Sequence, residues 1–338
     1  MNEREINAPI PVTIVTGFLG CGKTTLLNYI LTERHGEKIA VIENEFGEVG
    51  IDNELLLSGD EQIVEMNNGC ICCTVRGDLI RILGELADKR AAGSLQFDRV
   101  LIETTGLATP GPVAQTFFLD EEVSRRYLLD AVVTLVDAVH AMRQLDEHDQ
   151  AQEQVGFADR LLLSKTDLVD AEQIETLSQR LHAINPRADI QAVYFGQTPL
   201  AALLDIRGFN LNAVLEIAPG FLAGGHPHNH HAHRHDNRIS SCVFRSELPF
   251  DNHKLQDFLR AIARVYGADL LRYKGVLSID GLPYRVIIQG VHELMGGSAG
   301  ADWADGEERG STFVFIGRNL PREIIEQGLR QSQVKDFE

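Results

Sequence analysis

Residues 17–24 read Gly17-Phe18-Leu19-Gly20-Cys21-Gly22-Lys23-Thr24, between an apolar run at 11–16 and another at 26–31. The order is a predicted strand, a glycine-rich loop and a predicted helix, which is the context of a phosphate-binding loop. Glycines let the backbone wrap closely around phosphate oxygens, so that main-chain N–H groups and the helix N-terminus face the negative charge. A chance match is the alternative, and the flanking strand and helix argue against it.

Two side chains of this loop have defined roles toward a nucleotide. The Lys23 ammonium reaches the β- and γ-phosphates, and the Thr24 hydroxyl coordinates Mg²⁺. We therefore predict both as catalytic residues. The predicted nucleotide contacts here are Gly17, Gly20, Cys21, Gly22, Lys23, Thr24 and Thr25.

Length, charge and composition narrow the classes of protein. The chain has 338 residues, is 44% hydrophobic and carries a formal net charge of -18. This size allows two domains, and the acidity argues against a large nucleic-acid surface, which needs lysine and arginine. No apolar run approaches the ~20 residues of a membrane helix, and residues 1–5 are too polar to open a signal peptide. We expect a cytoplasmic protein without nucleic-acid or membrane partners.

An acidic segment follows the next predicted strand, Lys38 to Ile42. It spans residues 43–52, where nucleotide hydrolases place the first switch, a loop ordered by the γ-phosphate and Mg²⁺. Glu43 and Glu48 are therefore candidate residues whose positions depend on both the bound metal and the bound nucleotide. The alternative is a solvated acidic loop.

Three cysteines then fall within four residues, Cys70, Cys72 and Cys73. Adjacent cysteines do not normally close a relaxed disulfide, whereas thiolates on a tight turn converge on a borderline ion such as Zn²⁺. Tetrahedral zinc needs four ligands, and we nominate Glu43 or Glu48 to complete the set. Buried apolar cysteines and a redox role are the alternatives.

Two more strand ends carry residues that fit a nucleotide hydrolase. Glu103 follows the predicted strand 97–102 and suits the metal and γ-phosphate side of the site, although a strand-end glutamate is often only solvated. Ser164-Lys165-Thr166-Asp167 follows the predicted strand 160–163. There a carboxylate accepts hydrogen bonds from guanine N1 and the 2-amino group, and the Lys stem covers the base. We predict that Ser164, Lys165 and Asp167 select GTP.

The alternation of predicted strands and helices indicates an α/β fold, a P-loop NTPase-like and mostly parallel sheet flanked by helices. We expect this domain at 1–222, with its last strand at 190–195, and a smaller α+β domain at 238–338. The expected strands of the second domain are 240–245, 274–279, 284–291 and 312–316, and its helices are 253–266 and 321–329. Gly296-Gly297-Ser298 reads as a turn.

Residues 223–237 are expected to be a histidine-rich linker between the two domains, with six histidines at 226–235. His228, His230 and His231 are candidate metal contacts. Their affinity would be lower than that of the thiolates, because a floppy loop loses entropy when its ligands converge. A polar spacer is the alternative.

These motifs together resemble the CobW-type family of P-loop GTPases, and within it the bacterial YjiA-type members. The resemblance rests on Gly17–Thr24, Glu43–Gly47, Gly69–Cys73, Glu103–Gly106, Ser164–Asp167 and Leu271–Gly275. It implies a zinc-binding, slowly hydrolysing GTPase of the metallochaperone group. Guanine-reading loops of that family commonly begin with Asn, where this chain has Ser164.

The expected function is a GTPase that hydrolyses GTP to GDP and phosphate and couples nucleotide state to the binding or delivery of a transition metal. The predicted catalytic residues are Lys23, Thr24 and Glu103, with Mg²⁺ as cofactor and zinc, or else nickel or cobalt, as the metal. A recipient metalloprotein and a nucleotide- or metal-dependent homo-oligomer are possible partners. The alternative is a GTP-dependent metal sensor or regulatory module without delivery. A kinase is disfavoured, because no acceptor pocket is evident in the sequence.

Overall fold

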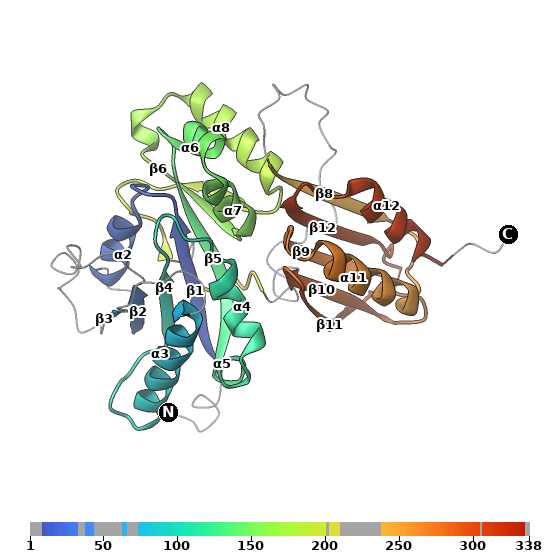
Figure 1. Ribbon diagram of the computed structural model, residues 1–338, viewed down its shortest axis with the longest axis horizontal. Coiled ribbons are helices and arrows are strands. Elements are labelled where there is room, and N and C mark those ends of the chain that lie inside the picture. Colours follow the sequence, from blue (N-terminus) through green and yellow to red (C-terminus); the bar gives the residue numbers. More distant parts are fainter. Residues whose placement is uncertain are drawn as a thin grey trace. The chain divides into compact units, whose positions relative to one another are not determined.

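The computed structural model describes residues 9–32, 38–43, 63–65, 74–200, 203–209, 238–304 and 306–334. They form two compact units (Figure 1). The N-terminal unit holds the described residues of Met1–His182 and Arg187–Ile206, and the C-terminal unit holds those of Ala183–Pro186 and Arg207–Glu338. The predicted linker 223–237 lies outside the described residues.

The N-terminal unit is built on a seven-stranded sheet with the order β3-β2-β4-β1-β5-β6-β7. Every neighbouring pair in it is parallel. The strands are β1 (Ile10–Gly17), β2 (Ile39–Glu43), β3 (Ile63–Glu65), β4 (Arg99–Glu103), β5 (Tyr127–Asp137), β6 (Arg160–Ser164) and β7 (Asp189–Ala192). The predicted parallel α/β fold is confirmed, and β3 is a strand that the sequence analysis did not anticipate.

Helices flank this sheet, as Figure 1 shows. They are α2 (Lys23–Thr32), α3 (Thr74–Ala91), α4 (Gly111–Leu119), α5 (Glu121–Arg126), α6 (Ala141–Glu147), α7 (Asp149–Phe157) and α8 (Ala171–Ile184), with the 3₁₀ helix η2 (Thr166–Leu168) after β6. The central strands are apolar along their length because both faces of a parallel sheet are covered. Val12, Ile14 and Val133 are fully buried accordingly.

The parallel arrangement brings six strand-terminal residues to one edge of the sheet. They are Gly17, Glu43, Glu65, Glu103, Asp137 and Ser164, the last residues of β1 to β6. In open α/β sheets, ligands bind at the carboxyl ends of the strands. The fold therefore gathers most of the sequence-predicted strand-end residues along the edge where a ligand is expected.

The C-terminal unit is a five-stranded antiparallel sheet with the order β11-β10-β9-β12-β8. Its elements are β8 (Ile239–Ser246), α11 (Asn252–Tyr266), β9 (Leu270–Leu277), β10 (Tyr284–Val291), β11 (Leu294–Asp302), β12 (Ser311–Arg318) and α12 (Arg322–Gln331). The prediction of a turn at Gly296–Ser298 is wrong, because these residues lie within β11. Small residues are a turn signal only where the chain reverses, and here the reversal lies at His292, whose φ is 53°.

Aromatic side chains fill the core of this unit. The Phe313 and Phe315 rings are fully buried and stack with centroids 4.4 Å apart, and Tyr273 stacks on Phe315. Gly290 lies opposite Tyr273, where a Cβ would fall 2.0 Å from the ring. No helix among the described residues is long and apolar enough to cross a membrane.

Candidate nucleotide site and metal-binding segment

The P-loop (residues 17–24) leaves β1 and enters α2 through three glycines with positive φ. The angles are 144° at Gly17, 73° at Gly20 and 101° at Gly22, a region that L side chains adopt only under strain. At Gly17 a Cβ would also lie 2.4 Å from the Leu135 carbonyl oxygen. The glycines therefore set the loop's path, as its sequence predicts.

Lys23 and Thr24 stand in the first turn of α2, directly after that loop. The buried Lys23 Nζ donates to the Gly17 carbonyl at 3.0 Å and lies 3.5 Å from the Phe18 carbonyl. The ammonium is thus held within the loop. Cys21 is fully buried, and burial raises the pKa of its thiol to about 11. It stays a neutral thiol near neutral pH, so any nucleotide contact it makes is through its backbone.

The predicted guanine-reading loop, Ser164–Asp167, is braced against the P-loop by two hydrogen bonds. The Ser164 hydroxyl donates to the Cys21 carbonyl at 2.6 Å, and Lys165 Nζ donates to the Gly20 carbonyl at 2.9 Å. Lys165 has a φ of 58°, and Asp167 follows it, exposed, in η2. Serine at the first position therefore provides a hydroxyl that ties the two loops together.

Asp137, at the end of β5, is a site residue that the sequence analysis missed. Its Oδ2 accepts from Lys165 Nζ at 2.7 Å and lies 2.9 Å from His140 Nδ1, and its Oδ1 accepts from the Val139 N–H at 2.9 Å. Burial alone would raise the pKa of this carboxyl. The hydrogen bonds from Lys165 and His140, with the Lys165 charge, outweigh burial and hold the pKa below its usual value.

We expect Asp137→Asn to lower the free energy of unfolding by about 2 kcal/mol at pH 7, because it removes a buried charge-assisted hydrogen bond. A depressed folded pKa gives stability that is present above the unfolded pKa, about 4, and is lost as pH falls through the folded pKa. The difference in the free energy of unfolding between wild type and Asp137→Asn should therefore shrink as the pH falls. Urea unfolding at pH values from 7 to 3 measures this difference. The difference in unfolding free energy between wild type and Lys165→Met is expected to shrink in the same way. A gap that is constant with pH would contradict the ion pair.

Glu43 and Glu103 are placed side by side by the register of β2 and β4. Glu43 is buried and Glu103 half-buried, and Glu103 in turn pairs with Val15 of β1, two residues before the P-loop. On the other side Glu43 pairs with Glu65, which ends β3. Two of the predicted carboxylates thus share one edge with the P-loop.

The predicted thiolate site begins directly after that edge. Cys70 is five residues beyond Glu65, and Cys73 immediately precedes Thr74, where α3 begins. The side chains Glu48, Cys70, Cys72, Cys73, His228, His230 and His231 all lie outside the described residues. Within the described ranges, no three His, Cys, Asp or Glu side chains gather as a metal site. The metal assignments of these residues stay predictions.

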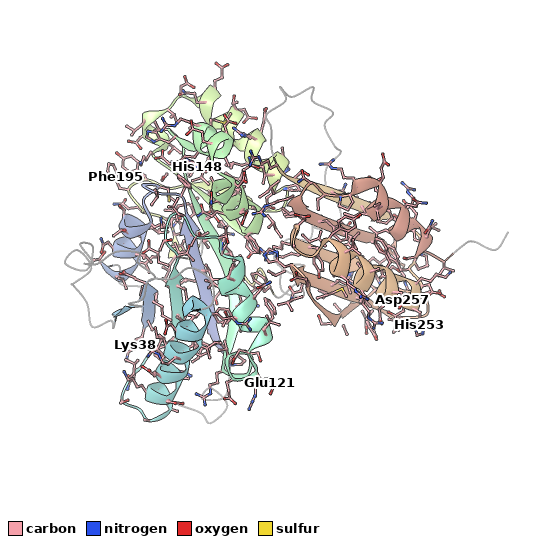
Figure 2. The ribbon with its side chains drawn as sticks, in the orientation of Figure 1. Lys38, Glu121, His148, Phe195, His253 and Asp257 are labelled. Carbon is pink, nitrogen blue, oxygen red and sulfur yellow. The ribbon has the colours of Figure 1, made fainter. Side chains whose placement is uncertain are left out.

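A turn at Tyr194–Gln197 also joins this edge, and the sequence analysis had placed Tyr194 and Phe195 in a strand. β7 ends at Ala192 instead, and the chain turns at Phe195, whose φ is 48°. Its side chain is 67% exposed (Figure 2). It meets the Tyr194 ring edge-on, with ring centroids 4.7 Å apart. Gly196 lies so close to α2 that a Cβ would be 2.8 Å from the Thr25 carbonyl oxygen. A bulky residue with positive φ is an uncommon conformation, of the kind found at ligand sites.

Comparison with known proteins agrees with this geometry. The CobW/HypB/UreG nucleotide-binding domain matches residues 11–192, and the cobalamin synthesis protein cobW C-terminal domain matches residues 239–333. Zinc chaperone YjiA of Escherichia coli (strain K12) is 46% identical over 318 residues, which cover 94% of this chain and 96% of that protein. Zinc chaperone CobW of Pseudomonas aeruginosa is 34% identical, over 96% of this chain and 91% of that protein.

A solved structure of the first relative has the same fold. The crystal structure of Zn(II)-bound YjiA GTPase from E. coli has a TM-score of 0.79 at 40% identity, covering 97% of this chain and 100% of that one. A triple mutant of that GTPase, with a glutamate and two cysteines replaced by alanine, is also Zn(II)-bound and also has a TM-score of 0.79. Together with the P-loop and both family matches, these relatives show that the chain belongs to the CobW/HypB/UreG family of P-loop GTPases.

Proposed function

We propose that the chain is a zinc chaperone in which GTP binding and hydrolysis set the affinity for zinc. The observation that carries this proposal is the register of β3, β2 and β4. It lines up Glu65, Glu43 and Glu103, with Glu103 beside β1 and Glu65 leading into the cysteine segment. From Glu103 to Glu65, which precedes Cys70 by five residues, this register spans two strand spacings, about 10 Å.

The nucleotide end of this path uses the P-loop and the guanine-reading loop. Lys23 stabilises charge on the β- and γ-phosphates, and Asp167 accepts from the guanine base. Thr24 and Glu103 offer hydroxyl and carboxylate oxygens, the donor set that Mg²⁺ prefers, so they fit as the residues that would hold it. When bound, Mg²⁺ neutralises phosphate charge. Glu103, or else the switch carboxylate Glu48, would orient the attacking water.

The metal end consists of the thiolates of Cys70, Cys72 and Cys73 with Glu43 or Glu48 as a further ligand. Soft thiolates with a borderline ion favour zinc, and nickel or cobalt would compete at the same donors. His228, His230 and His231 form a second, weaker collector. Zinc held in one nucleotide state and released in the other would pass to a recipient metalloprotein, and a homo-oligomer that changes with nucleotide or metal is a natural companion of such a switch.

The test is the zinc dissociation constant, measured with a competing chelator in the Mg²⁺–GTP-analogue and Mg²⁺–GDP states. Linkage makes metal and nucleotide affect one another equally. We expect a difference of about tenfold or more, roughly 1.4 kcal/mol of coupling. Equal zinc dissociation constants in the two nucleotide states would overturn the proposal. The alternative function, a regulatory binding module without metal delivery, would then be favoured.

Zinc stoichiometry must be measured in the same experiment, because the triple mutant of the E. coli relative is itself Zn(II)-bound. Replacing Cys70, Cys72 and Cys73 by Ala should remove the zinc ion whose affinity depends on nucleotide. Measured without zinc, the GTP affinity of that variant should stay within twofold of wild type, because the coupling acts only when the ion is bound. A His228, His230 and His231 triple Ala variant should instead retain the nucleotide-dependent ion.

A further inference from the structure

We propose that Gln154 of α7 is a positioning residue for GTP hydrolysis, which holds the loop after β4 against the P-loop. This inference rests on the proposed GTPase function. The Gln154 side chain is 1% exposed, and its Nε2 donates to the Gly106 carbonyl at 3.1 Å and to the Ala108 carbonyl at 2.9 Å. Both amide hydrogens are thus used on one loop, 46 and 48 residues away in sequence.

That loop, residues 104–108, lies directly on the P-loop. A Cβ on Gly106 would fall 2.7 Å from the Leu19 backbone nitrogen, so the two backbones touch. At its start, the Thr104 N–H donates to the Val15 carbonyl at 3.0 Å, and its hydroxyl donates to the Thr16 hydroxyl at 2.7 Å. β1 therefore fixes one end of the loop, and Gln154 fixes the other.

α7 is itself fixed to the sheet and to the P-loop. The Thr134 hydroxyl of β5 donates to the Gln154 carbonyl at 2.8 Å. His148 is the residue before α7 (Figure 2). Its ring stacks on Phe18 of the P-loop, with ring centroids 4.7 Å apart. The amide hydrogen bonds of Gln154 therefore join the loop to a helix that both β5 and the P-loop hold in place.

The held loop contains the groups closest in sequence to the proposed chemistry. It begins after Glu103, and its Thr105 hydroxyl is buried without a hydrogen-bond partner among the described residues. A buried hydroxyl costs free energy unless it is paired, so it is available to a phosphate oxygen or to the attacking water. Displacing a positioning group by about 1 Å can cost as much as 10²-fold in rate. Freeing the carbonyls of Gly106 and Ala108 allows a displacement of this kind.

The alternative is that Gln154 only satisfies buried carbonyls, and the same helix offers a matched control for it. Gln152 is 2% exposed, and its Nε2 donates to the Leu145 carbonyl at 2.7 Å, away from the loop. Gln152→Met and Gln154→Met therefore remove the same kind of hydrogen bond, from side chain to backbone carbonyl, within one turn of α7. A purely structural role predicts equal effects of the two substitutions on hydrolysis.

The experiment compares both variants with wild type by kcat for GTP, by GDP affinity and by hydrogen–deuterium exchange of peptides that cover 104–108. We expect Gln154→Met to lower kcat by 10- to 100-fold, to speed exchange of that loop and to change GDP affinity less than twofold. Gln152→Met should keep kcat within about twofold. Gln154→Asn has a shorter amide that reaches at most one of the two carbonyls. Its kcat and loop exchange should lie between those of wild type and Gln154→Met, and it replaces the Met variant in the test if that variant does not fold.

Equal kcat and equal loop exchange in the two Met variants would overturn the inference while leaving the GTPase proposal intact. Faster loop exchange in Gln154→Met, in a protein whose wild type shows no GTP turnover, would instead support the positioning contact and overturn the proposed function. The two failures are therefore distinguishable in one set of samples.

Discussion

Lys23→Met is expected to reduce kcat for GTP hydrolysis by about 10²–10³-fold, the usual cost of removing one donor aimed at developing charge. The Lys23 ammonium is held at the Gly17 carbonyl, inside the loop that is predicted to wrap the phosphates. Methionine has nearly the same length and no charge, so it removes the donor from this buried position without leaving a large cavity. Single-turnover hydrolysis at saturating GTP measures the change in the chemical step.

The matched control is Lys38→Met. Lys38 precedes β2 and therefore lies at the amino-terminal edge of the parallel sheet, opposite the P-loop (Figure 2). It is exposed, and we expect kcat to stay within twofold of wild type. Zinc affinity without nucleotide should be unchanged in Lys23→Met, while its response to GTP disappears. Normal turnover in Lys23→Met would remove the P-loop from the catalytic site.

The parts of the site that the sequence predicts are those in which one short segment carries the whole chemistry. The P-loop needs glycines, Lys23 and Thr24 in fixed order, and the structure gives them the positive φ angles and the helix start that the motif requires. The guanine-reading loop is equally local. Ser164 stands where this loop commonly has Asn. Only the structure shows what the serine does, because its hydroxyl donates to the backbone carbonyl of Cys21, 143 residues away in sequence.

The residues that were missed depend on partners far away in sequence. Asp137 looks like any strand-end carboxylate until Lys165 is placed on it, 28 residues later. The same signal that selected Glu103, an acid at the end of a buried strand, would have found it. No feature of the sequence identifies Gln154. A glutamine in a predicted helix indicates neither that its side chain is buried nor which backbone carbonyls accept its hydrogen bonds. The prediction of a strand through Phe195 is wrong because a run of β-prone residues gives no sign of the left-handed φ at Phe195.

Asp167→Asn is expected to raise KM for GTP by about 100-fold or more and to reverse the preference between GTP and xanthosine triphosphate. Guanine presents two donors, N1–H and the 2-amino group, and a carboxylate accepts from both. The Asn side chain has one acceptor, its carbonyl oxygen, and one donor group, its NH₂. One of the two guanine donors would therefore face the Asn NH₂ group without an acceptor. A site built to pair a polar group rejects the ligand that leaves that group unmatched.

Xanthine carries a carbonyl where guanine has its 2-amino group. The Asn amide N–H would donate to that carbonyl, while its oxygen accepts from N1–H. Asp167 lies on the loop that Ser164 and Lys165 tie to the P-loop, so the position of this loop relative to the predicted phosphate-binding loop is fixed. The substitution therefore changes which base is accepted without changing how the phosphates are held, and kcat at saturation should stay within a few fold for the matched nucleotide.

The measurement is kcat/KM for both nucleotides with wild type, Asp167→Asn and a control, Asp170→Asn. Asp170 is exposed three residues further on, and its Oδ1 accepts from the Gln173 N–H at 2.8 Å, so it caps α8 and should not affect the choice of base. Wild type and Asp170→Asn should both favour GTP. If Asp167→Asn kept the wild-type ratio, base recognition would have to move away from Ser164–Asp167, and the exposed Tyr194–Phe195 pair at the same edge would be the next candidate.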